Sequence, residues 1–147
     1  MVWGIVRMWD ERFTVEWDYL VTEAGVPMSW VYPDHGGQNG NVDEPWKTHI
    51  ARVADLGGPF VVITPIDGHN VQGGVALPGF THPSECYYLF GSDRHNMSLD
   101  DDGIEIDPVL NGYQGEMHKV YIPGVGKSLH SPLAAAMVMY DRIVKGA

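Results

Sequence analysis

The sequence has little cysteine, little positive charge and no long apolar stretch. Its one cysteine, Cys86, cannot form a disulfide within the chain, so the composition gives no indication of a disulfide-stapled secreted domain. No apolar run approaches the roughly 18 residues of a membrane-spanning helix, so we expect no membrane partner. Arg7 and Asp10 interrupt the apolar start of the chain, which argues against a signal peptide. We therefore expect a soluble cytoplasmic protein.

Positive charge is scarce because 9 lysines and arginines stand against 19 aspartates and glutamates, a formal net charge of −10. Such a chain repels a phosphate backbone, whereas nucleic-acid-binding proteins usually carry a basic patch. An RNA partner would have to meet a small local patch, or one shared across a dimer interface. Lys47, Arg52 and Lys127 are the cations that could contact it, and the alternative is that they are ordinary surface charges.

The remaining composition is that of a folded protein. Hydrophobic residues make up 44 % of the 147 positions, which excludes a disordered chain and is enough for one hydrophobic core. We expect residues 1–147 to form a single domain.

Apolar runs and turn residues alternate along the chain. They predict strands at residues 2–9, 26–32, 60–65, 85–90 and 120–123, and helices at 13–24, 46–56 and 133–144. The acidic residues and proline at positions 43–45 suit the start of the second helix, and Gly25 suits the end of the first. Alternating strands and helices predict an α/β fold with a mostly parallel sheet flanked by helices. Ligands in such sheets usually bind outside the carboxyl ends of the strands, where the loops after Gly91 and Pro123 would lie.

Two blocks of sequence carry a family resemblance. The first is FTHPSECYYLFGSD at 80–93, with a His-Pro lead-in, an apolar strand and then Gly91. The second is VYIPGVGKSLHSPLAAA at 120–136, whose helix ends in Tyr140, Asp141 and Arg142. These blocks resemble the second and third motifs of the SpoU-type RNA ribose methyltransferases, which belong to the SPOUT class.

The resemblance implies a C-terminal trefoil knot and a homodimer built from the first and last helices. It also implies S-adenosylmethionine as cofactor and a ribose 2′-hydroxyl of tRNA or rRNA as substrate. The residues it assigns to cofactor binding are Leu89, Gly91, Ile122, Pro123, Gly124, Ser128 and Leu129. Two alternatives stay open: a catalytically inactive SPOUT-fold dimeric binding or assembly module, and a methyltransferase for a protein side chain or small molecule.

The reacting residues depart from the family pattern. Glu16, Asp18 and Thr22 stand where the first motif has Asn, Gly and Arg, although a second alignment supplies Arg52 instead. Elsewhere Asp93 replaces Glu, Asn96 replaces Gly, His130 replaces Asn and Pro132 replaces Ser. The catalytic candidates are therefore His130 and Arg52. His130 is either a general base or a structural substitute for the Asn.

Metal and nucleotide sites are not expected. The seven histidines form no His-x-x-x-His pair and have no supporting cysteine cluster. The acidic stretch from residue 98 resembles a calcium loop, but Val109 occupies the position of the bidentate acid. The GVGKS sequence at 124–128 resembles a phosphate-binding loop, but Tyr121 stands where that motif requires glycine.

Overall fold

The computed structural model describes residues 3–8, 14–25, 28–31, 47–49, 56–63, 74–90, 113–123 and 131–147. The strands are β1 (Gly4–Met8), β2 (Met28–Val31), β3 (Lys47–His49), β4 (Phe60–Ile63), β5 (Val75–Ala76), β6 (Tyr87–Phe90) and β7 (Met117–Tyr121). The helices are α1 (Thr14–Ala24), the short 3-10 helix η2 (Leu77–Gly79) and α3 (Ser131–Val144). The strands form one sheet in the order β3-β2-β1-β6-β4-β7-β5, and every pairing is parallel. The predicted α/β class is confirmed.

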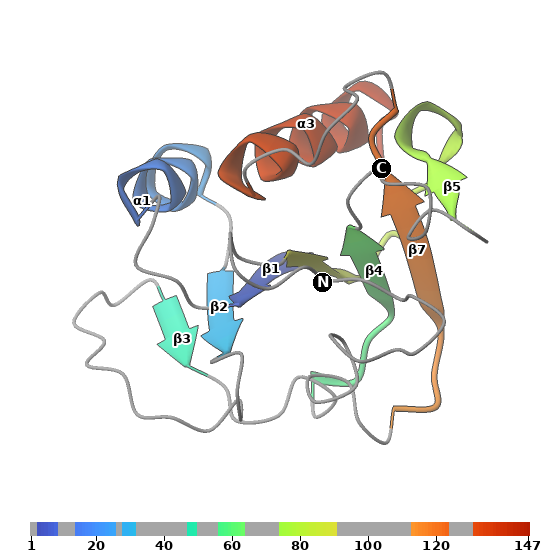
Figure 1. The fold of residues 1–147 in the computed structure, drawn as a ribbon, viewed down its shortest axis with the longest axis horizontal. Helices are drawn as coiled ribbons and strands as arrows, with labels where there is room; N and C mark the ends of the chain where they lie inside the picture. Colours follow the sequence, from blue (N-terminus) through green and yellow to red (C-terminus); the bar gives the residue numbers. More distant parts are fainter. Residues whose placement is uncertain are drawn as a thin grey trace.

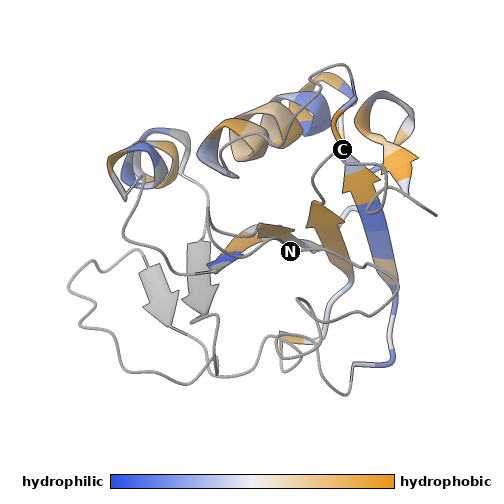
Figure 2. Ribbon diagram, in the orientation of Figure 1, coloured by the Kyte–Doolittle hydropathy of each residue, from blue (hydrophilic) through white to orange (hydrophobic). Residues whose placement is uncertain are grey.

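Both α1 and α3 cover the same face of the sheet (Figure 1). Side chains alternate along each strand, so Tyr88 and Phe90 of β6 join the core cluster beneath the helices. Trp17 of α1 and Ala135 of α3 belong to the same cluster. The apolar colour of β1, β4 and α3 in Figure 2 follows this layer.

The opposite face of the central strands is buried as well. Val6, Phe60, Val62 and Leu89 have no exposed surface, yet they lie outside the cluster beneath the helices. Strands buried on both faces need apolar residues at successive positions, which explains the unbroken run from Phe60 to Ile63.

Helix α1 ends where the sequence predicted. Gly25 has φ of 67°, a left-handed conformation that glycine adopts without strain, and its N–H donates to the carbonyl of Val21 at 3.0 Å. Helix α3 begins at Ser131, two residues earlier than expected, and places Pro132 in its first turn. Proline costs little there because the first turn leaves its N–H groups unpaired in any case.

The predicted helix at 46–56 is wrong at its start, because Lys47–His49 form the edge strand β3. This strand pairs with β2, Met28 opposite Lys47 and Trp30 opposite His49, so backbone hydrogen bonds to the sheet outweigh the helix-start signal. Strand β7 begins at Met117 rather than at residue 120, because its register with β4 starts at Phe60.

Several predicted segments lie outside the described residues. They are the acidic stretch from residue 98 and the chain after Gly91 and after Pro123, to which the resemblance assigns the knot. Among the helices that are described, none has the length and apolar character to cross a membrane.

The Gly57–Gly58 turn before β4 gives a stability test. Both glycines have positive φ, 87° and 64°. A Cβ on Gly57 would meet open space, whereas one on Gly58 would overlap the hydroxyl of Tyr113. Gly58→Ala should therefore cost about 2 kcal/mol of unfolding free energy and Gly57→Ala about 1 kcal/mol, measured by denaturant titration. In a Tyr113→Ala background the two costs should converge, and equal costs in the unmodified chain would contradict the packing described.

Candidate functional site

The central strands end together at one edge of the sheet. Phe90 of β6 lies opposite Arg7 of β1, and Val62 of β4 lies opposite Leu89. Ile63 of β4 in turn lies opposite Val120 of β7. Because all these pairings are parallel, the carboxyl ends of β1, β6, β4 and β7 share this edge, which we call the carboxyl edge. It is the usual place for a ligand in an open α/β sheet.

Three of the predicted cofactor-binding residues are described, and all three lie at or near the carboxyl edge. Leu89 is the third residue of β6, and its side chain is fully buried on the face away from the helices. Ile122 follows β7 directly, half-buried against the core cluster, and Pro123 next to it is exposed. The strands that carry them are separated only by β4. Gly91, Gly124, Ser128, Leu129 and both catalytic candidates, His130 and Arg52, lie outside the described residues.

A buried arginine near the carboxyl edge was missed by the sequence reasoning. Arg7 is only 1 % exposed, and its guanidinium lies 5.0 Å from the ring centre of Trp17. That indole also packs edge-on against Phe90, with ring centres 5.8 Å apart. A charged residue within an apolar strand is the signal that could have identified it, since a buried guanidinium is costly unless its surroundings stabilise it.

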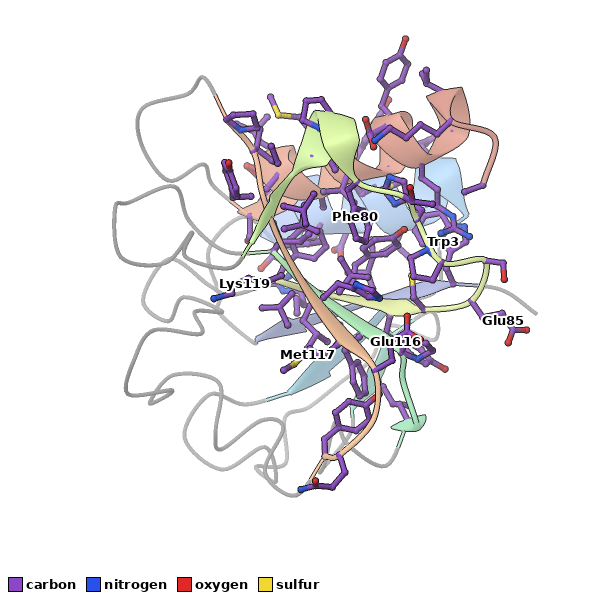
Figure 3. The ribbon with its side chains drawn as sticks, turned by 90° about the vertical axis from the view of Figure 1, so that its right-hand side faces the viewer. Trp3, Phe80, Glu85, Glu116, Met117 and Lys119 are labelled. Carbon is purple, nitrogen blue, oxygen red and sulfur yellow. The ribbon has the colours of Figure 1, made fainter. Side chains whose placement is uncertain are left out.

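A second buried arginine holds α3 against the chain that leads into β6. The Nη1 of Arg142 donates to the carbonyl of Pro83 at 2.7 Å and to the Tyr88 hydroxyl at 2.9 Å. Its Nη2 donates to the carbonyl of Ser84 at 2.8 Å. The guanidinium also lies over the ring of Trp3, 5.2 Å from its centre. Figure 3 shows Trp3 near the carboxyl-terminal end of α3.

The same cluster contains a chain of acid–base groups. The Tyr88 hydroxyl oxygen accepts a hydrogen bond from Arg142, so its O–H can donate to Nδ1 of His82, 2.7 Å away. Nε2 of His82 then donates to Asp141 at 2.7 Å. Lys145 completes the cluster with an ion pair to Asp141 at 2.7 Å and hydrogen bonds to the carbonyls of Leu77 and Phe80.

Burial determines how these groups titrate. Desolvation lowers the pKa of His82 below its ordinary value of 6.5, and the neighbouring Asp141 offsets only part of that effect. Desolvation also raises the pKa of Tyr88 and of Cys86. Burial acts to raise the pKa of Asp141 as well, but the hydrogen bonds from Lys145 and His82 outweigh it and lower that pKa. At neutral pH the cluster therefore holds a neutral imidazole and an ionised carboxylate.

This cluster is built to position rather than to react. The side chain of His82 has no exposed surface, and its two nitrogens are both engaged. His82, Tyr88, Asp141 and Arg142 come from the two blocks that carry the family resemblance, whereas Trp3 and Lys145 lie outside them. Each was visible in the sequence, but nothing in the spacing indicated that they touch. In the described part of the chain no three His, Cys, Asp or Glu side chains group as metal ligands.

Comparison with protein-family models finds no match for this chain. Comparison with curated protein sequences also finds no match.

The buried imidazole predicts an acid-dependent loss of stability. Because the native pKa of His82 lies below 6.5, the unfolded chain takes up a proton there more readily than the native protein. The free energy of unfolding should therefore fall as the pH drops through 6.5, by at most about 1.4 kcal/mol per pH unit for this proton, and level off below the native pKa.

Denaturant titrations between pH 8 and pH 4 would measure this slope. His82→Gln should flatten it. An unaltered slope in His82→Gln would show that another group is responsible.

Proposed function

We propose that the chain is an S-adenosylmethionine-dependent methyltransferase of the SPOUT class that acts on a ribose 2′-hydroxyl of RNA, with a knotted C-terminal region. One observation carries the proposal. Strands β6 and β7, which precede the two family-like loops, end at the same edge of a parallel sheet with only β4 between them. Two loops that the resemblance assigns to one cofactor therefore start from neighbouring points.

In this proposal the cofactor lies beyond the carboxyl edge and supplies an electrophilic methyl group. The contacts come from Leu89, Gly91, Ile122, Pro123, Gly124, Ser128 and Leu129. The chain contributes mainly by holding the ribose hydroxyl in line with the methyl group, since alignment alone can lower a barrier by several kcal/mol. His130 and Arg52 are the candidates for assisting the departure of the proton.

The RNA contact in this proposal is small. Arg7 and Arg142 are buried, and Lys145 is committed to Asp141 and to two backbone carbonyls. The charges of these three side chains are therefore engaged in contacts within the fold. Contacts to phosphate would have to come from the other six lysines and arginines, among which Lys47, Arg52 and Lys127 are the candidates, and this suits a short RNA segment rather than a long duplex.

A second copy of the chain is the partner we propose for the outer surface of α1 and α3. Apolar side chains on these helices are exposed: Val15 and Tyr19 on α1, and Leu133, Met137, Tyr140, Ile143 and Val144 on α3. On α3 the spacing of three and four residues places most of them in one stripe. The two helices contact each other on the same face of the sheet (Figure 1). Large exposed apolar patches mark association sites.

The same surface also supports the alternative, a catalytically inactive dimeric module. On α1, Glu16 and Thr22 replace the Asn and Arg of the family's first motif, and both are exposed. A helix altered in this way keeps its capacity to associate while losing groups that act on the substrate. Cofactor binding separates the two functions.

Isothermal titration calorimetry with S-adenosylmethionine and S-adenosylhomocysteine tests the catalytic proposal. We expect micromolar dissociation constants, abolished by Gly91→Trp because the indole would fill the space that the cofactor needs. Gly79→Trp is the matched control, since a Cβ at Gly79 meets no neighbouring atom. Binding would justify a screen of RNA substrates, whereas no heat at millimolar cofactor would exclude the methyltransferase and leave the inactive module.

Sedimentation equilibrium tests the dimer. Tyr140→Glu and Ile143→Glu each place a charge in the α3 stripe, where both native side chains are 69 % exposed. Either change should weaken dimerisation at least tenfold without lowering the melting temperature. Met117→Glu, an exposed apolar position on β7, should have no effect. A monomeric unmodified protein at high concentration would rule the interface out.

A further inference from the structure

Helix α3 connects two places that are far apart. It begins at Ser131, directly after the segment proposed to bind the cofactor, and Arg142 lies eleven residues further along. At 1.5 Å per residue these points are about 16 Å apart along the helix axis. Arg142 is thus remote from the carboxyl edge and cannot touch a cofactor bound there.

The hydrogen bonds of Arg142 fix the orientation of α3 as well as its distance from the chain that leads into β6. Two of its hydrogen bonds end on backbone carbonyls, those of Pro83 and Ser84, which cannot turn away as side chains can. The planar guanidinium has to match both carbonyls and the Tyr88 hydroxyl at once. Rotation or sliding of α3 would break several of these bonds together.

Neighbouring residues on α3 tie the helix to the same stretch of chain. Asp141 binds His82, and Lys145 binds the carbonyls of Leu77 and Phe80. Figure 3 shows Phe80 lying between the sheet and α3. Between this end and the start of the helix, Ala135 and Val138 are fully buried in the core. The helix is therefore pinned at one end and closely packed along its length.

We propose that Arg142 is a positioning residue of the cofactor site, one that fixes the register of α3 against the entry to β6. This inference depends on the proposed function. The entry to β6 leads to one cofactor loop and the start of α3 ends the other. A single register between them fixes the end of β6 relative to the start of α3, the points at which those two loops are attached.

Two substitutions test the role of Arg142, and a third controls for lost stability. Arg142→Met removes the hydrogen bonds to Pro83, Ser84 and Tyr88, and the longer one to the Cys86 sulfur at 3.9 Å, while keeping an apolar stem of similar length. Tyr88→Phe removes one hydroxyl from the same cluster and serves as the milder variant if Arg142→Met does not fold. The control is Phe60→Leu, at the amino end of β4 and on the opposite face of the sheet, where Phe60 is fully buried against Tyr113.

Two quantities are measured at 15 °C on the folded proteins, after denaturant titration has ranked their stabilities. The first is the dissociation constant of S-adenosylmethionine. It should rise at least tenfold in Arg142→Met and about threefold in Tyr88→Phe, and stay within twofold in Phe60→Leu. The second is amide hydrogen exchange at residues 135–138 of α3, which should accelerate in the two cluster variants and not in the control.

The outcomes separate the two proposals. If the unmodified protein does not bind the cofactor, the proposed function fails. Hydrogen exchange then still decides whether Arg142 fixes α3. If the unmodified protein binds but the cluster variants bind equally well, Arg142 has no positioning role. The same conclusion follows if affinity falls in Phe60→Leu as much as in Arg142→Met.

Discussion

The burial of the Arg142 guanidinium is the constraint on which the arrangement of the described core depends. A positive charge removed from water destabilises the fold unless neighbouring groups compensate it. Here two backbone carbonyls, a tyrosine hydroxyl and the face of Trp3 share that task. Because these groups belong to α3, to the approach to β6 and to the chain before β1, satisfying one side chain brings three distant parts of the sequence together.

The other buried arginine, Arg7, is arranged differently. It lies near the carboxyl ends of the strands, whereas Arg142 contacts the chain that leads into β6, and it packs on Trp17 of α1. Arg7 thus packs against α1, whereas Arg142 belongs to α3, the other helix of the same layer. Each guanidinium lies close to an aromatic ring, whose face attracts a cation. This gives a role within the core to two of the tryptophans in the N-terminal part of the chain.

Much of the fold could be predicted from local patterns. The run from Phe60 to Ile63 is apolar at every position because the strand is covered on both faces, and Gly25 ends α1 because it adopts positive φ. The edge strand at Lys47–His49 was not predictable in this way, since it depends on pairing with β2, a partner distant in sequence. The candidate site divides similarly. The α/β pattern predicted that a ligand site would lie at the carboxyl ends of the strands, whereas the contact of Arg142 with Pro83 and Ser84 depends on how α3 lies across the sheet.

The burial of both arginines changes how the protein meets its surroundings. The formal charge of −10 includes both of them, but neither guanidinium is exposed, so fewer cations are available for contacts at the surface than the composition suggests. Two copies approaching through the apolar sides of α1 and α3 would repel each other at long range before contact. Dissolved salt shortens that repulsion, to about 8 Å at physiological ionic strength, while leaving the attraction between apolar surfaces intact. Self-association of this chain should consequently tighten as ionic strength rises, the reverse of the behaviour of a complex with nucleic acid.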